Sequence, residues 1–127
     1  MDWAPISEVD LWDLVSKAEA RMSPQLFRLW QAIKITPQKW SEQSFGKAGG
    51  GFWVVALVGK NVIWYNDIEE GFNRSSYRHL GEIAAYFCNQ DELEVAVQDV
   101  LTLIETGIDF TPRRSAPVAG VYPPHSG

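Results

Sequence analysis

The densest group of polar side chains follows an apolar run, and it is where chemistry would be expected. Residues 65–79 read YNDIEEGFNRSSYRH, and Asp67, Glu69 and Asn73 are oxygen donors of the kind that Ca²⁺ binds. The spacing fails the calcium-loop pattern, because Gly71 falls one position too early and Arg78 stands where a bidentate glutamate is needed. We therefore expect a solvated, hydrogen-bonded loop and no metal.

The same stretch, with the cysteine that follows it, contains the groups that a small enzyme would need. These candidate groups are Asp67, Glu69, His79 and Cys88. Glu69 and Glu70 are adjacent and point to opposite sides of an extended chain, so they do not form the carboxylate pair of a glycosidase. We expect Cys88 to be buried and His79 to lie on the surface. No catalytic residue is assigned, and a small enzyme is kept as an alternative.

Two features suggest anion binding, and each has a simpler explanation. Arg74 and Arg78 are four residues apart, and we expect them to pair with the carboxylates of residues 67–70. The glycine-rich stretch 46–51 (GKAGGG) has its lysine before the glycines and a predicted strand after them, whereas a phosphate loop has the opposite order and a following helix. With 11 Lys and Arg against 16 Asp and Glu, the net charge of −5 disfavours a nucleic-acid partner.

The composition is typical of a single folded domain. The chain has 127 residues, of which 46% are apolar, and no apolar run approaches the roughly 18 residues of a membrane span. Its single cysteine excludes an intramolecular disulfide and a zinc ribbon. We expect a cytoplasmic protein with no cofactor and no membrane association, folded over residues 1–110 and followed by a flexible proline-rich tail over 111–127.

Three helices are predicted from caps and apolar spacing. Ser7 begins the first helix, whose apolar residues recur every three or four positions. Ser23 begins the second, which must end before Pro37, and these two helices should pack as a hairpin. Asn89 is expected to cap the third helix, and Gly107 to end it.

An antiparallel sheet of three to five strands is predicted between the second and third helices. Residues 52–58 (FWVVALV) are apolar throughout, which is typical of a strand covered on both faces, and 62–65 (VIWY) return after a tight turn. Residues 72–77 and 82–88 are candidates for two further strands, and Trp40 for an edge strand. With the third helix packed on the sheet, the predicted fold class is α+β.

The tryptophans raise the question of an exposed aromatic surface. The helical core accounts for Trp12 and Trp30, whereas Trp53 and Trp64 lie on strands whose opposite faces are apolar too. If the helical hairpin does not cover the second face of the sheet, an aromatic surface remains for a partner or for self-association.

Residues 62–73 (VIWYNDIEEGFN), followed by 88–94 (CNQDELE), resemble a pattern found in a family of small bacterial proteins. The resemblance covers residues 50–106 and carries no activity, cofactor or fold with it, so it implies only a bacterial, cytosolic protein. We expect the two stretches to meet in one hydrogen-bonded cluster, made of Asn66, Asp67, Asn73, Asn89 and Gln90.

These observations favour a non-catalytic, acidic protein-interaction module, a class that includes inhibitors and immunity proteins. Residues 61–94 carry seven acidic and two basic side chains, and complementary charge would steer association with a basic protein partner. The expected binding residues are Trp64, Asn66, Asp67, Glu69, Glu70, Asn73 and Arg74. A structural homodimer that self-associates through the sheet is a further alternative.

Overall fold

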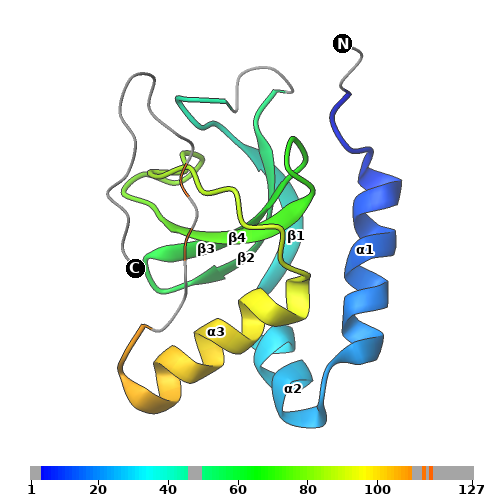
Figure 1. Cartoon of the computed structure of the whole chain (residues 1–127), viewed down its shortest axis with the longest axis vertical. Helices are drawn as coiled ribbons and strands as arrows, with labels where there is room; N and C mark the ends of the chain where they lie inside the picture. Colours follow the sequence, from blue (N-terminus) through cyan, green and yellow to red (C-terminus); the bar gives the residue numbers. More distant parts are fainter. Residues whose placement is uncertain (1–3, 46–49, 110–112, 114, 116–127) are drawn as a thin grey trace, which may run out of the picture.

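The computed structural model describes residues 4–45, 50–109, 113 and 115. Within them the chain forms three helices and four strands: α1 (Glu8–Arg21), α2 (Pro24–Ile33), β1 (Lys34–Trp40), β2 (Phe52–Val58), β3 (Asn61–Asn66), β4 (Gly71–Ser76) and α3 (Leu93–Thr106). The strands form one antiparallel sheet in the order β1-β2-β3-β4, and Figure 1 shows α1 along one side of it, with α2 and α3 at its lower end. The predicted α+β class is confirmed. Apart from residues 113 and 115, the predicted tail lies outside the described residues.

The first two helices begin and end as their caps predict. The hydroxyls of Ser7 and Ser23 each accept a hydrogen bond from the backbone N–H three residues later, at 3.1 and 3.2 Å. α2 ends before Pro37, which lies in β1. The indole Nε1 of Trp30 donates to the carboxylate of Glu19 at 2.7 Å, and this hydrogen bond ties α2 to α1.

The start of α3 differs from the prediction. Glu92 occupies the N-cap position in place of Asn89, and its side chain makes no capping hydrogen bond. Asn89 lies three residues before this N-cap, and its backbone N–H donates to Oδ1 of Asn73 at 2.8 Å. Gly107 ends the helix as predicted, with a φ of 73° that glycine adopts without strain.

Both faces of the sheet are buried, by different parts of the chain. On one face, Val55, Ile63 and Phe72 pack against the three helices. On the other face, Trp40, Phe52 and Trp64 form a second cluster. The helices therefore account for one face, and another segment is needed to cover the second.

Residues 77–90 cover the second face as a loop that crosses the sheet. The predicted strand over 82–88 is therefore wrong, although isolated backbone contacts remain, such as the N–H of Ile83 donating to the carbonyl oxygen of Ser41 at 2.8 Å. Ile83 and Tyr86 pack on the cluster that contains Trp64. A strand would pair with the edge of the sheet, whereas Ile83 and Tyr86 pack over its face. Trp12, expected in the core, is 43% exposed.

Gly71 lies where the end of this segment passes closest to β4. A Cβ at this position would lie 2.2 Å from the carbonyl oxygen of Asn89 and 2.4 Å from the Cα of Gln90. Because both atoms belong to the backbone, no side-chain rotation relieves the contact. We expect Gly71→Ala to lower the free energy of unfolding in urea by about 3 kcal/mol or more, the upper end of the usual cost of overpacking, because backbone atoms must move.

Gly59→Ala is the matched control for this prediction. A Cβ at Gly59 meets nothing within 4 Å, but its φ is +58°, so the variant should lose about 1 kcal/mol from backbone strain alone. Equal losses for the two variants would contradict the close approach of the backbone at Gly71.

Candidate functional site

Amide side chains join the sheet to the chain that leads into α3. Nδ2 of Asn73 donates to the carbonyl oxygen of Asn89 at 3.0 Å, while Oδ1 of Asn73 accepts from the backbone N–H of Asn89 at 2.8 Å. Nδ2 of Asn66 donates to the carbonyl oxygen of Phe87 at 3.0 Å. Nε2 of Gln90 donates to the carbonyl oxygen of Glu69, in the turn before β4, at 3.1 Å. The predicted meeting of the two stretches is confirmed at Asn73 and Asn89, whereas Asn66 and Gln90 hydrogen-bond to the backbone of Phe87 and Glu69. We call Asn66, Asn73, Asn89 and Gln90 the amide clamp, since most of its hydrogen bonds run to the backbone and hold the fold.

Asp67, predicted in the same cluster, has a different partner. Its Oδ2 accepts a hydrogen bond from the backbone N–H of Ile6 at 2.9 Å, which ties the chain before α1 to the turn after β3. Burial raises the pKa of Asp67, and the hydrogen bond from Ile6 opposes this shift. The carboxyl group therefore has a structural contact of its own.

The structure buries most of the side chains that the sequence indicated as a binding surface. Trp64 is fully buried, and its Nε1 donates to Oγ of Ser75 at 2.9 Å. The expectation that Trp64 faces a partner is corrected, because residues 77–90 cover it. The other buried members of the predicted set are Asn66, Asp67, Asn73 and Arg74. Glu69 and Glu70 are exposed.

Arg74 forms an ion pair outside the acidic turn with which it was predicted to pair. Its Nη2 lies 2.9 Å from Oδ2 of Asp109, and its Nη1 donates to Oδ1 of Asn61 at 3.1 Å. Asp109 also lies 3.0 Å from Arg113. Because Arg74 belongs to β4 and Asp109 follows α3, this ion pair fixes the end of α3 to the sheet.

The groups considered for a small enzyme are not gathered around His79. That residue is exposed, as predicted, and lines a pocket of about 520 Å³ with Glu42 and Glu82. Asp67, Glu69 and Cys88 are not among its described lining residues. Cys88 is half-buried, and not buried as predicted.

Two other pockets hold charged groups that pair with each other. One, of about 230 Å³, lies between α1 and β1, where the carboxylate of Glu19 accepts from Trp30 and lies 3.9 Å from Nζ of Lys34. Another, of about 400 Å³, contains the ion pair between Arg74 and Asp109. The charges in both pockets are thus already compensated within the protein.

A fourth pocket is lined by two aromatic and three acidic residues. It has a volume of about 310 Å³ and is lined by Leu14, Tyr65, Glu70, Phe72, Asp91 and Glu92. The rings of Tyr65 and Phe72, which are register partners on β3 and β4, have centroids 4.9 Å apart. The described lining residues include no Lys or Arg. We call this cavity the Tyr65 pocket.

The hydroxyl of Tyr65 has no hydrogen-bond partner among the residues that the structure describes. Tyr65 is 8% exposed and lines the pocket. Burial raises the pKa of its hydroxyl, and the charges of Glu70, Asp67 and Glu92 raise it further. The phenol is therefore neutral at ordinary pH and retains both its donor and its acceptor capacity for a ligand.

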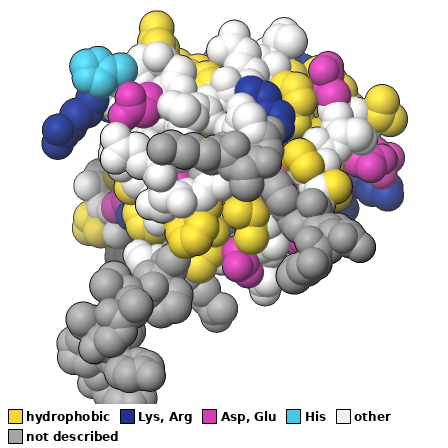
Figure 2. Space-filling view, turned by 90° about the horizontal axis from the view of Figure 1, so that it is seen from above, with side chains coloured by type: hydrophobic (Ala, Val, Ile, Leu, Met, Phe, Trp, Pro, Cys, Tyr) yellow, Lys and Arg dark blue, Asp and Glu magenta, His cyan; other side chains and the backbone are white. Residues whose placement is uncertain are grey.

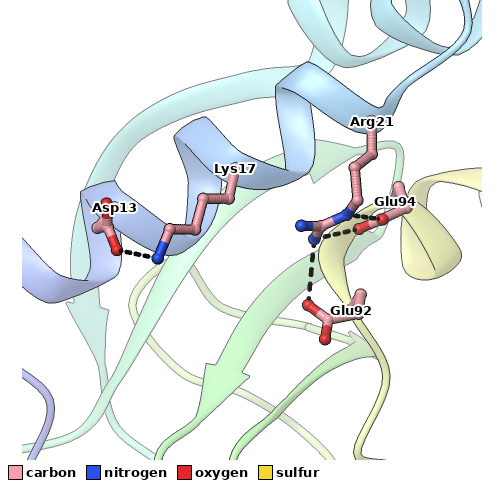
Figure 3. Close-up of polar contacts among 5 residues, drawn as sticks. All are labelled: Asp13, Lys17, Arg21, Glu92 and Glu94. Atoms are coloured by element: carbon pink, nitrogen blue, oxygen red, sulfur yellow. Dashed lines mark hydrogen bonds and ion pairs between the residues drawn. The ribbon is translucent and has the colours of Figure 1, made fainter.

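Two of the three carboxylates in the pocket have contacts within the protein. Asp91 accepts from Nδ2 of Asn89 at 3.1 Å. Glu92 lies 3.2 Å from Arg21, which also hydrogen-bonds to Glu94 and holds the pKa of Glu94 below its usual value (Figure 3). Arg21 thus fixes the acidic start of α3 against α1.

Glu70 is the third carboxylate, and its side chain makes no hydrogen bond or ion pair with the described part of the chain. Its backbone is left-handed, with a φ of 58°, a conformation that costs a residue with a Cβ about 1–2 kcal/mol. A charged side chain therefore stands at the pocket in a position where glycine would be unstrained.

The sequence indicates Glu70 but not the rest of this pocket. Asp91 and Glu92 lie 21 and 22 residues after Glu70, and Leu14 belongs to the first helix. The excess of acidic residues over 61–94 is the one signal that points towards them. Their meeting depends on the register of β3 with β4 and on the path of residues 77–90.

Comparisons with protein-family models, with curated proteins and with solved structures found no match to this chain. Among the described residues, no helix is long and apolar enough to cross a membrane. In the same part of the chain, no group of three or more His, Cys, Asp or Glu side chains is placed to hold a metal ion. The fold and the geometry of the Tyr65 pocket are what a functional proposal can rest on.

The buried carboxyl group of Asp67 predicts a pH dependence of stability. Its pKa in the folded protein lies above the ordinary value of 3.8, so the folded state holds a proton that the unfolded state releases. The stability that this proton contributes is complete below the unfolded pKa and is lost as the pH rises through the folded pKa. Asp67→Asn should remove this loss, because an amide oxygen still accepts from Ile6 and does not ionise.

Urea denaturation from about pH 4 to about pH 7 gives the free energy of unfolding as a function of pH. The effect is the difference in slope between the wild-type and Asp67→Asn proteins. Asp99 has a raised pKa for the same leading reason, burial, and it adds a loss of the same sign to both proteins. Identical slopes in the two proteins would contradict the assignment to Asp67.

Proposed function

We propose that this protein is a non-catalytic interaction module that binds a basic segment of a partner protein at the Tyr65 pocket. The observation that supports it is the composition of the pocket, whose lining combines three acidic residues with Tyr65 and Phe72. The Tyr65 hydroxyl has no partner among the described residues, so it can donate to and accept from a ligand.

The charge around the pocket favours a cationic ligand. Glu70, Asp91 and Glu92 line it, and the exposed Glu69 lies beside Glu70 in the turn between β3 and β4. Opposite charges on a partner would steer its approach and fix its orientation. Figure 2 shows the acidic side chains of one face in several separate places, with basic ones among them. The proposal therefore depends on the charges around one pocket rather than on the net charge of the chain.

The surroundings of the pocket favour a preformed site. The amide clamp holds the chain before α3 against β4, and Arg21 holds Glu92 from the side of α1. A site held in its binding geometry loses little conformational freedom when the partner arrives. Inhibitors or immunity proteins that mask a basic enzyme in the bacterial cytoplasm are the specific class that we propose on these grounds.

Selection from a random phage-displayed peptide library tests the proposal, because such a library presents basic, neutral and acidic peptides alike. We expect the enriched peptides to carry a net positive charge and to bind less tightly as the salt concentration rises. Their affinity, measured by fluorescence anisotropy, should fall about tenfold in Glu70→Gln, because a carboxylate at the ligand is lost.

Glu69→Gln is the matched control. It removes the same charge at the neighbouring residue, whose side chain does not line the pocket. It should change the affinity by less than about twofold, as expected of a charge in contact with solvent. Enrichment of neutral or acidic peptides, or equal losses for the two variants, would rule out a basic ligand at this pocket.

A further inference from the structure

We infer that the Tyr65 pocket receives the side chain of a single lysine of the partner, with its ammonium group bound between the Tyr65 hydroxyl and the Glu70 carboxylate. This inference rests on the proposed function and specifies the group that is recognised. It follows from three properties of the pocket, namely its apolar floor, its two available polar groups and its size.

The floor of the pocket matches the stem of a lysine side chain. The half-buried Leu14 and the accessible edges of Tyr65 and Phe72, which are 8% and 2% exposed, provide a small apolar surface. Long basic side chains pack their methylene groups on such surface while the charged end reaches polar groups. Aromatic faces also attract a cation that lies over them. A small inorganic cation would leave this apolar surface unused.

The polar groups of the pocket match an ammonium group. Within the described residues, the Tyr65 hydroxyl and the Glu70 carboxylate have no hydrogen-bond partner, whereas Asp91 and Glu92 are held by Asn89 and Arg21. An ammonium group has three donors, so it can donate to the hydroxyl oxygen and to the carboxylate at once. The Tyr65 hydroxyl can in turn donate to a carboxylate. Asp91 and Glu92 then contribute negative potential without direct contact.

The same geometry favours lysine over arginine. A guanidinium group is planar and binds best to two acceptor oxygens in its own plane, such as both oxygens of one carboxylate. A guanidinium group can also bridge acceptors on different elements, as Arg74 does between Asn61 and Asp109. The preference for lysine therefore rests on size, since an ammonium group is more compact and its donors rotate. The volume of about 310 Å³ is at the small end of ligand pockets, enough for one side chain.

Three capped pentapeptides test the inference by NMR titration of the isotope-labelled protein: Ac-GGKGG-NH₂, its arginine analogue and its norleucine analogue. We expect the lysine peptide to shift the backbone amide signals of Tyr65, Glu70 and Phe72. Its affinity should exceed that of the arginine peptide by about fivefold or more. The norleucine peptide should not bind, because it lacks the ammonium group and its hydrogen bonds. Calcium chloride and n-butylammonium chloride serve as ligand controls for a bare cation and a free amine.

Two tyrosine variants separate recognition from folding. Tyr65→Phe removes a hydroxyl that has no partner in the described structure, so it should weaken the lysine peptide about tenfold and leave the urea midpoint unchanged. Tyr77 is the control, because its hydroxyl donates to the carbonyl oxygen of Gly59 at 3.2 Å and lies outside the pocket. Tyr77→Phe should leave binding unchanged.

The outcomes distinguish this inference from the proposed function. Equal binding of the lysine and arginine peptides, tighter binding of n-butylammonium than of the lysine peptide, or no effect of Tyr65→Phe would overturn the lysine site while leaving a basic partner in place. If neither basic peptide shifts the pocket signals and the selected library peptides are not basic, both proposals fail. Displacement of the lysine peptide by calcium at equal ionic strength would assign the pocket to a metal cation instead.

Discussion

The covered second face of the sheet and the Tyr65 pocket both depend on two hydrogen bonds between the side chain of Asn73 and the backbone of Asn89. Both residues are buried, so breaking this contact would leave polar groups away from water. The contact fixes the end of residues 77–90 to β4, and these residues then close over Phe52 and Trp64. One amide side chain therefore helps to decide whether the second face of the sheet is covered.

The Tyr65 pocket depends on the same contact. The backbone N–H of Phe72 donates to the carbonyl oxygen of Asp91 at 2.8 Å, next to the hydrogen bonds of the amide clamp. This places Asp91 and Glu92 beside the rings of Tyr65 and Phe72. The pocket is thus built on the sheet and on the start of a helix, and its shape is tied to the packing of the core. A pocket of this kind is expected to change little in shape when a ligand enters it.

The local parts of the fold follow from the sequence, and the long-range parts do not. Ser7 and Ser23 begin helices and Gly107 ends one through contacts within a few residues, so their patterns predict the boundaries. Residues 82–88 have the composition of a strand. Their path is set by the sheet face on which they pack, and the local sequence does not determine that path. For the same reason the sequence places Trp64 on a surface and misses Asp91 and Glu92 as neighbours of Tyr65. The density of acidic residues is the useful signal, because it points to Glu70.

The left-handed backbone of Glu70 has a consequence for laboratory evolution. Glycine at this position would relieve the strain, and it would at the same time remove the one carboxylate of the pocket that has no partner in the described chain. A screen for thermal stability alone would therefore enrich sequences that lose the proposed ligand. A screen that alternates heating with binding would retain the acid and improve other positions. Under the proposed function, stability and recognition are therefore opposed at Glu70.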